Sequence, residues 1–275
     1  KIFSICVGNI YLGGTGKTPT TIKLFEIINK INKSTITAKK FYKNQKDEMI
    51  LLKNKTRFFT GLNRKEIITK AVKKKYKIII FDDGLQDRNI EYNLKLVCFD
   101  TLDWIGNGNL IPAGPLREKL SSLKRFDAVF LKNVNQPNYK VINIIKKINP
   151  KIKVFNSRYK IINLKKFNLR KKYIIFSGIG NPNNFEKLLI KNKFKIIQHF
   201  KYPDHYKYEK NDIKKMIYEA DKLKVEILTT EKDYIKIHKI YQKKIKRINV
   251  DLVINNQKNL IQFLKKMIKN KKWKE

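Results

Sequence analysis

The chain has few cysteines and no long apolar run. Its 275 residues include only two cysteines, Cys6 and Cys98, and each stands in a short apolar segment typical of a buried strand. This usage predicts buried thiols in a reducing compartment and excludes a disulfide framework or a cysteine-based metal site. No uninterrupted apolar stretch approaches the roughly 18–20 residues of a transmembrane helix, and no signal peptide is recognisable. The length allows one large or two modest α/β domains with a real core.

An initiating methionine is also missing. The chain begins at Lys1, directly at its first apolar segment. We therefore expect a further N-terminal segment in the natural protein, and a membrane anchor there is compatible with the sequence.

Acidic residues are scarce relative to basic ones. Lys and Arg number 63 against 23 Asp and Glu, a formal net charge of +40. Such a charge favours nucleotides, nucleic acid or an anionic membrane surface as partners. An AT-rich genome, which enriches Lys, Asn and Ile everywhere, is the alternative explanation. No helix-turn-helix, RRM or KH signature is present, so we expect attraction to anionic surfaces but no specific nucleic-acid binding, and we infer no obligate protein partner.

Strand-like and helical segments alternate along the chain, which predicts a mostly parallel sheet with helices on both faces. Expected strands are Ile2–Val7, Tyr76–Phe81, Leu94–Phe99, Ala128–Leu131, Lys153–Phe155, a segment from Tyr173, Lys195–His199 and Val225–Thr229. Expected helices are Thr20–Ile31, Glu48–Lys53, Arg64–Lys74, Tyr139–Ile148, Asn183–Lys191, Lys210–Leu223 and Gln257–Asn270. A Lys-rich segment without periodicity near residues 157–172 suggests two α/β lobes, which we divide as residues 1–160 and 161–275.

A phosphate-binding loop follows the first expected strand. Glycine-rich backbone can cradle phosphate oxygens, a lysine can reach the β/γ-phosphates, a threonine hydroxyl can ligate Mg²⁺, and the next helix points its positive dipole end at the anion. The residues in these roles are Gly13, Gly14, Thr15, Gly16, Lys17 and Thr18. Tyr11 stands where the Walker A pattern has its first glycine, so this is a shortened Gly-Gly variant. The sequence therefore predicts binding of a nucleoside triphosphate.

Carboxylates follow another expected strand. Asp82 and Asp83 come directly after the apolar segment Tyr76–Phe81. Carboxylates at the C-terminal end of a parallel strand lie where ligands bind, and in a P-loop protein they hold Mg²⁺ directly or through water. The alternative is that they cap the next turn. Which of the two would touch the metal stays open.

Other candidates have plain structural alternatives. Asp47 and Glu48 precede a helical segment, and from spacing alone the better interpretation of Asp47 is an N-cap. Arg117 and Glu118 end a Gly- and Pro-rich loop from Asn107, where Arg117 could grip a phosphate or simply begin a solvated helix. Of the three histidines, His205 in Pro203-Asp204-His205 is the candidate, and His199 and His238 are expected to be structural. Thr230-Glu231-Lys232-Asp233 has the wrong order for the base-reading motif of GTPases.

Taken together, these motifs resemble the tetraacyldisaccharide 4′-kinases, the lipid A 4′-kinases of Gram-negative bacteria. The matching segments run in the family's order from residue 7 to residue 233. They are Val7-Gly8-Asn9, Gly13 to Pro19, Asp47-Glu48, Asp82-Asp83-Gly84-Leu85-Gln86, Gly106-Asn107-Gly108, Pro112 to Glu118, Gly178 to Pro182, Pro203-Asp204-His205 and Thr230 to Asp233.

The resemblance implies a RecA-like P-loop domain, a second α/β lobe closing the active-site cleft, and ATP- and Mg²⁺-dependent phosphorylation of the 4′-hydroxyl of a lipid A disaccharide 1-phosphate. It places the enzyme at the cytoplasmic face of the bacterial inner membrane. Carried over residue by residue, Asp47 would be the base and His205 its partner, which replaces the capping interpretation. Lys17 would act on the transferred phosphate, and Glu48, Gln86, Arg117 and Glu118 are candidates for sugar or phosphate contacts.

The sequence departs from the family pattern in two places. Leu85 and Asp87 flank Gln86 where the family usually has Phe and His. The segment Lys39-Lys40-Phe41-Tyr42-Lys43 replaces a Gly-Tyr-Gly-Arg-like stretch. Roles of those family residues are not carried over. The alternative functions are a P-loop GTPase or metallochaperone-like switch, which lacks its base-reading motif here, and a nucleic-acid-binding ATPase, which rests on charge alone.

Overall fold

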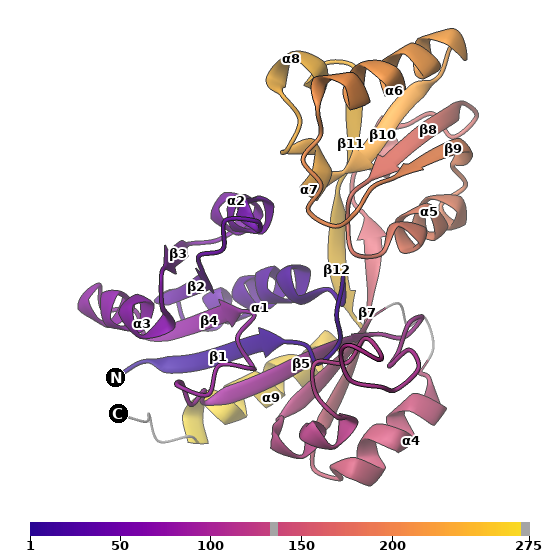
Figure 1. The fold of residues 1–275 in the computed structure, drawn as a ribbon. Helices are drawn as coiled ribbons and strands as arrows, with labels where there is room; N and C mark the ends of the chain where they lie inside the picture. Colours follow the sequence, from indigo (N-terminus) through magenta and orange to yellow (C-terminus); the bar gives the residue numbers. More distant parts are fainter. Residues whose placement is uncertain (133–136, 271–275) are drawn as a thin grey trace. The chain divides into compact units, whose positions relative to one another are not determined.

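A computed structural model describes residues 1–132 and 137–270 (Figure 1). The chain forms two compact units. Unit 1 consists of Lys1–Lys43, Leu52–Arg158 and Leu252–Glu275, and unit 2 consists of Asn44–Leu51 and Tyr159–Asp251. A single division at residue 160 would instead assign the C-terminal segment to the second unit and the short segment around Asp47 to the first.

Within the described residues, unit 1 is built on a sheet of eight strands in the order β12-β7-β6-β5-β1-β4-β2-β3. The strands are β1 (Phe3–Gly8), β2 (Thr35–Lys40), β3 (Phe58–Gly61), β4 (Ile78–Asp82), β5 (Leu94–Asp100), β6 (Ala128–Lys132), β7 (Lys153–Ile161) and β12 (Val250–Ile254). From β7 to β3 every neighbouring pair is parallel. The carboxyl ends of these strands therefore share one edge of the sheet, where ligands bind in such folds.

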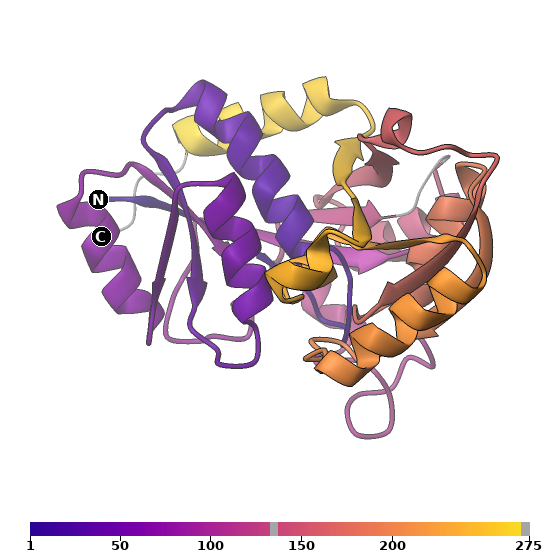
Figure 2. The same ribbon diagram turned by 90° about the horizontal axis from the view of Figure 1, so that it is seen from above.

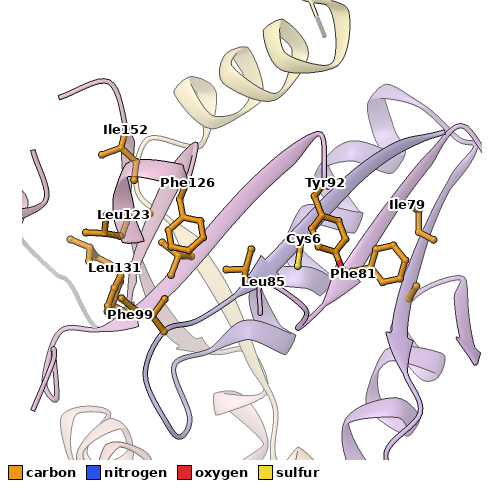
Figure 3. Packing of buried hydrophobic residues seen from close by; sticks show 14 of the residues in the cluster. Cys6, Ile79, Phe81, Leu85, Tyr92, Phe99, Leu123, Phe126, Leu131 and Ile152 are labelled. Atoms are coloured by element: carbon orange, nitrogen blue, oxygen red, sulfur yellow. The ribbon is translucent and has the colours of Figure 1, made fainter. Parts of the chain in front are cut away.

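Helices cover both faces of this sheet because its buried side chains alternate. Cys6 faces the cluster that includes α3 (Arg64–Lys73), α4 (Tyr139–Ile148) and the 3₁₀ helix η1 (Leu120–Arg125). Figure 3 shows the packing of this cluster around Cys6, Phe81, Phe99 and Leu131. The neighbouring strand residues face the opposite cluster, where α1 (Lys17–Ile31) and α9 (Gln257–Asn270) pack side by side (Figure 2). The expected two-faced α/β arrangement is confirmed.

Unit 2 has a smaller parallel sheet, four-stranded over the described part of the chain, in the order β11-β10-β8-β9. Its elements are η2 (Leu164–Lys166), β8 (Lys172–Ser177), α5 (Pro182–Lys191), β9 (Lys195–Lys201), α6 (Lys210–Lys222), β10 (Glu226–Thr230), α7 (Glu231–Tyr234), α8 (Lys239–Gln242) and β11 (Ile245–Ile248). Along β8, Tyr173 and Ile175 pack with α5, whereas Ile174 and Phe176 pack with α6. This alternation gives the smaller sheet two buried faces.

Most expected elements are present within one to three residues of their predicted ends, although β7 continues to Ile161, well past the expected end at Phe155. Strands β2, β3, β11 and β12 were not predicted. The sequence of β2 is Thr-Ile-Thr-Ala-Lys-Lys, which looks exposed, yet all but its last residue are buried. Its central position between β4 and β3 overrides its polar composition. In the described parts of the chain, no helix is both long and apolar enough to span a bilayer.

Candidate functional site

The glycine-rich loop joins β1 to α1 at the carboxyl edge of the larger sheet. Gly13 and Gly16 have φ angles of 106° and 87°, in the left-handed region that favours glycine, and Gly16 is the residue from which α1 begins. Inside the loop, the Asn9 side-chain amide donates to the Thr15 hydroxyl at 3.0 Å. The loop thus has a fixed interior and presents the N-terminus of a 15-residue helix, which is the arrangement that binds phosphate.

Asp82 contacts the first turn of this helix. The hydroxyl of Thr18 donates to Asp82 Oδ2 at 2.8 Å, and Lys39 Nζ lies 3.1 Å from the same oxygen. The side chains of Lys39 and Asp82 are 1% and 0% exposed, so the pair is fully desolvated, a situation that proteins tolerate only with good pairing. The structure therefore brings together the predicted residues Thr18 and Asp82 and adds Lys39, which sequence reasoning placed in a segment of unassigned function.

Asp83 lies beside the predicted lysine of the loop. Its Oδ2 atom is 3.7 Å from Lys17 Nζ and 3.5 Å from a terminal nitrogen of Arg117. Burial raises the pKa of Asp83, but the positive charges of Lys17, Lys39 and Arg117 outweigh burial and hold this pKa below its usual value. Asp83 is therefore an ionised carboxylate at neutral pH that gathers two cations suited to phosphate oxygens.

The loop that contains Arg117 is attached to the phosphate-binding loop through backbone and side-chain contacts. The Arg117 amide donates to the Ile10 carbonyl at 2.8 Å. The side-chain amide of Gln86 donates to Asn9 O at 2.9 Å and to Glu118 Oε1 at 3.0 Å. Gln86, Arg117 and Glu118, predicted as substrate residues, thus lie around the same loop. Asn9 was missed as a separate candidate, although it stands in the Val7-Gly8-Asn9 segment.

Asp87 has a structural partner. Its Oδ2 atom accepts from Arg64 at 2.8 Å, and Arg64 also donates to the Asp83 carbonyl at 3.0 Å. Burial raises the pKa of Asp87, but hydrogen bonds from the Asn89 amide and Arg64 outweigh it and lower this pKa. Asp87 is one of the residues that depart from the family pattern. Its ion pair with Arg64 supports the backbone of the Asp82-Asp83 turn.

A second group of charged residues lies within unit 2. Asp47, in the first turn of α2 (Lys46–Lys55), is 6% exposed. Its Oδ1 and Oδ2 atoms lie 2.9 and 3.1 Å from His205 Nδ1. His205 has a φ angle of 61°, a conformation that is uncommon for a residue with a side chain and that often marks a functional site. The structure brings the two predicted residues into direct contact.

Lysines surround this pair. Lys232 Nζ lies 3.6 Å from Asp47 Oδ2, and Lys236 Nζ lies 4.0 Å from the same atom. Burial raises the pKa of Asp47, but the His205 hydrogen bond and the charges of Lys232, His205 and Lys236 outweigh it, so this pKa is lowered. Asp47 is therefore ionised at neutral pH and able to accept a proton.

Lys232 also joins the remaining carboxylates of the group. It lies 3.0 Å from Asp204 Oδ1 and 3.5 Å from Glu48 Oε1. Burial lowers the pKa of Lys232, but Glu48, Asp204 and Asp47 outweigh burial and raise it, so the ammonium stays charged. Sequence reasoning named the segment 230–233 but gave Lys232 no role. Its position directly after a strand end was the available signal.

The segment after β10 explains how Lys232 is held. Thr230 caps α7 by accepting from the Asp233 amide, and its hydroxyl donates to Asp233 Oδ2 at 2.7 Å. Asp233 in turn accepts from the Gly178 amide at 3.1 Å and pairs with Lys236 at 2.6 Å. The motif is thus an anchor for two lysines and not a base-reading loop. His199 bonds to Ser177 and Glu186, and His238 caps α8.

The two groups offer different chemistry. Unit 1 offers a phosphate-binding loop with Lys17 and Arg117, and oxygen donors from Thr18, Asp82 and Asp83. Over the described residues, no cluster of three or more His, Cys, Asp or Glu side chains forms an all-protein metal cage. Mg²⁺ in phosphoryl-transfer sites typically uses one or two carboxylates together with phosphate and water, so the oxygen donors of unit 1 fit that ion. Unit 2 offers an ionised carboxylate paired with an imidazole.

The family model and the related sequences point to the same protein family. The family model described as LpxK, tetraacyldisaccharide-1-P 4′-kinase, matches residues 31–269. The tetraacyldisaccharide 4′-kinase of Pelagibacter ubique (strain HTCC1062) is 43% identical over 267 residues, which cover 97% of this chain and 85% of that protein. The tetraacyldisaccharide 4′-kinase of Rickettsia canadensis (strain McKiel) is 34% identical over 92% of this chain and 81% of its own length.

A solved structure shares the fold. The crystal structure of "apo" form LpxK from Aquifex aeolicus in complex with ATP matches with a TM-score of 0.68 and 21% sequence identity. The match covers 97% of this chain and 89% of that one. It supports the P-loop α/β architecture predicted from the sequence.

Proposed function

The chain belongs to the tetraacyldisaccharide 4′-kinase family, and from this premise we propose how its residues perform the family's reaction. It is a kinase of lipid A biosynthesis that phosphorylates tetraacyldisaccharide 1-phosphate at the 4′-hydroxyl. The single observation that carries the residue assignment is the contact between Asp47 and His205, which supplies a base distinct from the phosphate-binding loop.

ATP is the donor that the loop would hold. We assign the β- and γ-phosphates to Lys17 and to the backbone amides of residues 13–18, because glycine-rich backbone at a helix N-terminus binds such anions. A structure of the family contains ATP. Arg117, 3.5 Å from Asp83, is positioned to add a second cation for phosphate oxygens.

Thr18, Asp82 and Asp83 would hold Mg²⁺. The fit rests on the kind of donor atoms, because Mg²⁺ prefers oxygen ligands. The Thr18 hydroxyl lies 2.8 Å from an Asp82 carboxylate oxygen, and Asp83 adds a second carboxylate on the next residue. When bound, Mg²⁺ neutralises charge on the phosphates during transfer. Lys39 orients the Asp82 carboxylate through its 3.1 Å contact.

Asp47 would act as the base. The 4′-hydroxyl loses its proton to the Asp47 carboxylate as its oxygen bonds to the γ-phosphorus, and the bond between that phosphorus and the β,γ-bridging oxygen breaks to release ADP. His205 Nδ1, 2.9 Å away, orients the carboxylate, and Lys232 keeps it ionised. The loop belongs to unit 1 and Asp47 to unit 2. Glu48, Gln86 and Glu118 remain candidates for sugar contacts.

The substrate is a lipid, so the enzyme must meet a membrane. A net charge of +40 favours binding to the anionic cytoplasmic leaflet of the inner membrane, where each basic residue near the surface contributes about 1 kcal/mol. Co-sedimentation with vesicles containing anionic lipid, lost at high salt, is the expected result. Equal binding to neutral vesicles would contradict this electrostatic interpretation.

The activity itself has a direct test. Purified protein, ATP, Mg²⁺ and tetraacyldisaccharide 1-phosphate should yield a bisphosphorylated lipid detectable by mass spectrometry. A Lys17→Met variant, whose side chain is unbranched and one atom shorter and lacks the charge, is the matched control and should give little product. Absence of product with the wild-type protein, together with GTP hydrolysis in the absence of lipid, would favour a P-loop GTPase instead.

A further inference from the structure

A buried lysine outside the predicted site contacts the phosphate-binding loop. Lys132 is the last residue of β6 and is 5% exposed. Its ammonium lies 2.6 Å from the Gly14 carbonyl oxygen and 2.9 Å from Asp100 Oδ2. Asp100 is the last residue of β5 and is the direct neighbour of Lys132 in the parallel ladder. All of these residues belong to unit 1.

The buried end of an apolar strand is an unfavourable position for a lysine unless its ammonium has partners. The other four residues of β6 are apolar and buried, and an ammonium in such surroundings is costly unless it is paired and hydrogen-bonded. The partners it finds are a carboxylate on the next strand and a backbone carbonyl of the loop. Both lie at the carboxyl edge of the sheet, where ligands bind.

The contact restrains the two-glycine part of the loop. Gly13 and Gly14 have no side chains, so nothing of their own limits their backbone conformations. A peptide unit is planar, so a cation that binds the Gly14 carbonyl oxygen fixes the direction of the whole peptide between residues 14 and 15. A carbonyl turned toward a phosphate would repel it, whereas one bound to an ammonium is held in place and its partial charge is neutralised.

We propose that Lys132, held by Asp100, is a positioning residue for the nucleotide: it fixes the Gly14–Thr15 peptide of the shortened glycine loop in the conformation that binds the ATP phosphates. This inference rests on the proposed function. It concerns the donor alone, so removal of the ammonium should weaken ATP binding without changing the affinity for the lipid acceptor.

The test uses the full chain. We would measure the dissociation constant of ATP by calorimetry, and KM separately for ATP and for tetraacyldisaccharide 1-phosphate. Lys132→Met should weaken ATP binding and raise its KM by about tenfold or more, the effect of losing a charge-assisted hydrogen bond, with KM for the lipid unchanged. Lys132→Arg should recover most of the affinity. Lys153→Met, at an exposed position that begins β7, is the matched control and should resemble the wild type.

A second variant guards against misfolding. Lys132→Met leaves the Asp100 carboxylate buried without its cation, so the double variant Lys132→Met/Asp100→Asn removes both charges. Wild-type ATP affinity in either folded variant, or an equal rise of KM for both substrates, would overturn the proposal. A wild-type chain that binds no ATP would instead contradict the proposed function and remove this inference with it.

Discussion

The Nδ1 atom of His205 lies 2.9 Å from Oδ1 of Asp47, although the two residues are 158 positions apart in the sequence. The chain brings them together because residues 44–51 pack with unit 2, while the segments on either side of them belong to unit 1. The structure does not make Asp47 an N-cap, since α2 begins at Lys46; as the second residue of this helix, Asp47 acquires an imidazole partner and two nearby ammonium groups.

The role of Asp47 as base predicts a selective loss of turnover. Asp47→Asn should lower kcat by roughly 10²–10⁴-fold, the usual contribution of a general base, and leave the ATP dissociation constant unchanged, because the loop belongs to unit 1. His205→Gln should cost less, since it removes only the orienting partner. Steady-state kinetics and calorimetry measure both effects. An unchanged kcat in Asp47→Asn would show that this carboxylate is not the base.

The contact between Lys232 and Asp47 leads us to expect that removing Lys232 shifts the pH profile of kcat/KM. Its ammonium is among the groups that lower the pKa of Asp47, so Lys232→Met should raise that pKa. The acid limb of kcat/KM should then move to higher pH, because Asp47 becomes protonated sooner as the pH falls. Lys232→Arg keeps the charge and should keep the wild-type profile. A profile of Lys232→Met that superimposes on the wild type would show that Lys232 does not act on the base.

We expect Asp83 to make the free energy of unfolding depend on pH. Its pKa in the folded protein is lowered, because Lys17, Lys39 and Arg117 outweigh burial. A lowered folded pKa means that the stabilisation is fully present above the unfolded value of about 3.9 and is lost as the pH falls through the folded value. Urea unfolding should therefore show wild type more stable than Asp83→Asn at neutral pH, with the difference shrinking below about pH 4. A difference independent of pH would contradict this origin.

We expect a side chain at position 84 to destabilise the fold, because the space around Gly84 is filled. It has a φ angle of 145°, and a Cβ there would lie 2.7 Å from both Arg64 Nε and the Tyr92 hydroxyl. Gly84→Ala should destabilise the protein by roughly 1–3 kcal/mol through backbone strain, with an added cost from these two contacts. Gly108→Ala is the matched control, since φ is also positive (78°) but its nearest neighbour is 3.8 Å away. Equal losses of Tm in the two variants would show that the contacts at Gly84 contribute nothing.

The fold was largely predictable because its signals are local. Apolar strands such as β1 and β4, and amphipathic helices such as α1 and α4, are defined by the spacing of neighbouring residues. Strand β2 could not be predicted, since its burial comes from β3 and β4 on either side and not from its own composition.

The candidate site was predictable where a motif carries its chemistry in consecutive residues. The loop of residues 13–18, the Asp82-Asp83 pair and the Arg117-Glu118 pair are of this kind. Most of the lysines were not predictable. The chain contains 63 lysines and arginines, and nothing next to Lys39 or Lys132 in the sequence marks them as different from the exposed ones. Lys232 had one signal, its position directly after a strand end.

The sequence by itself therefore determined that this protein has a phosphate-binding loop on a parallel α/β sheet, because glycine conformation, strand and helix periodicity depend on adjacent residues. Only the tertiary structure decided which charges act together: Lys39 with Asp82, Lys132 with Gly14 and Lys232 with Asp47. The physical reason is that an ion pair depends on distance and desolvation, and both are set by the packing of segments far apart in the chain.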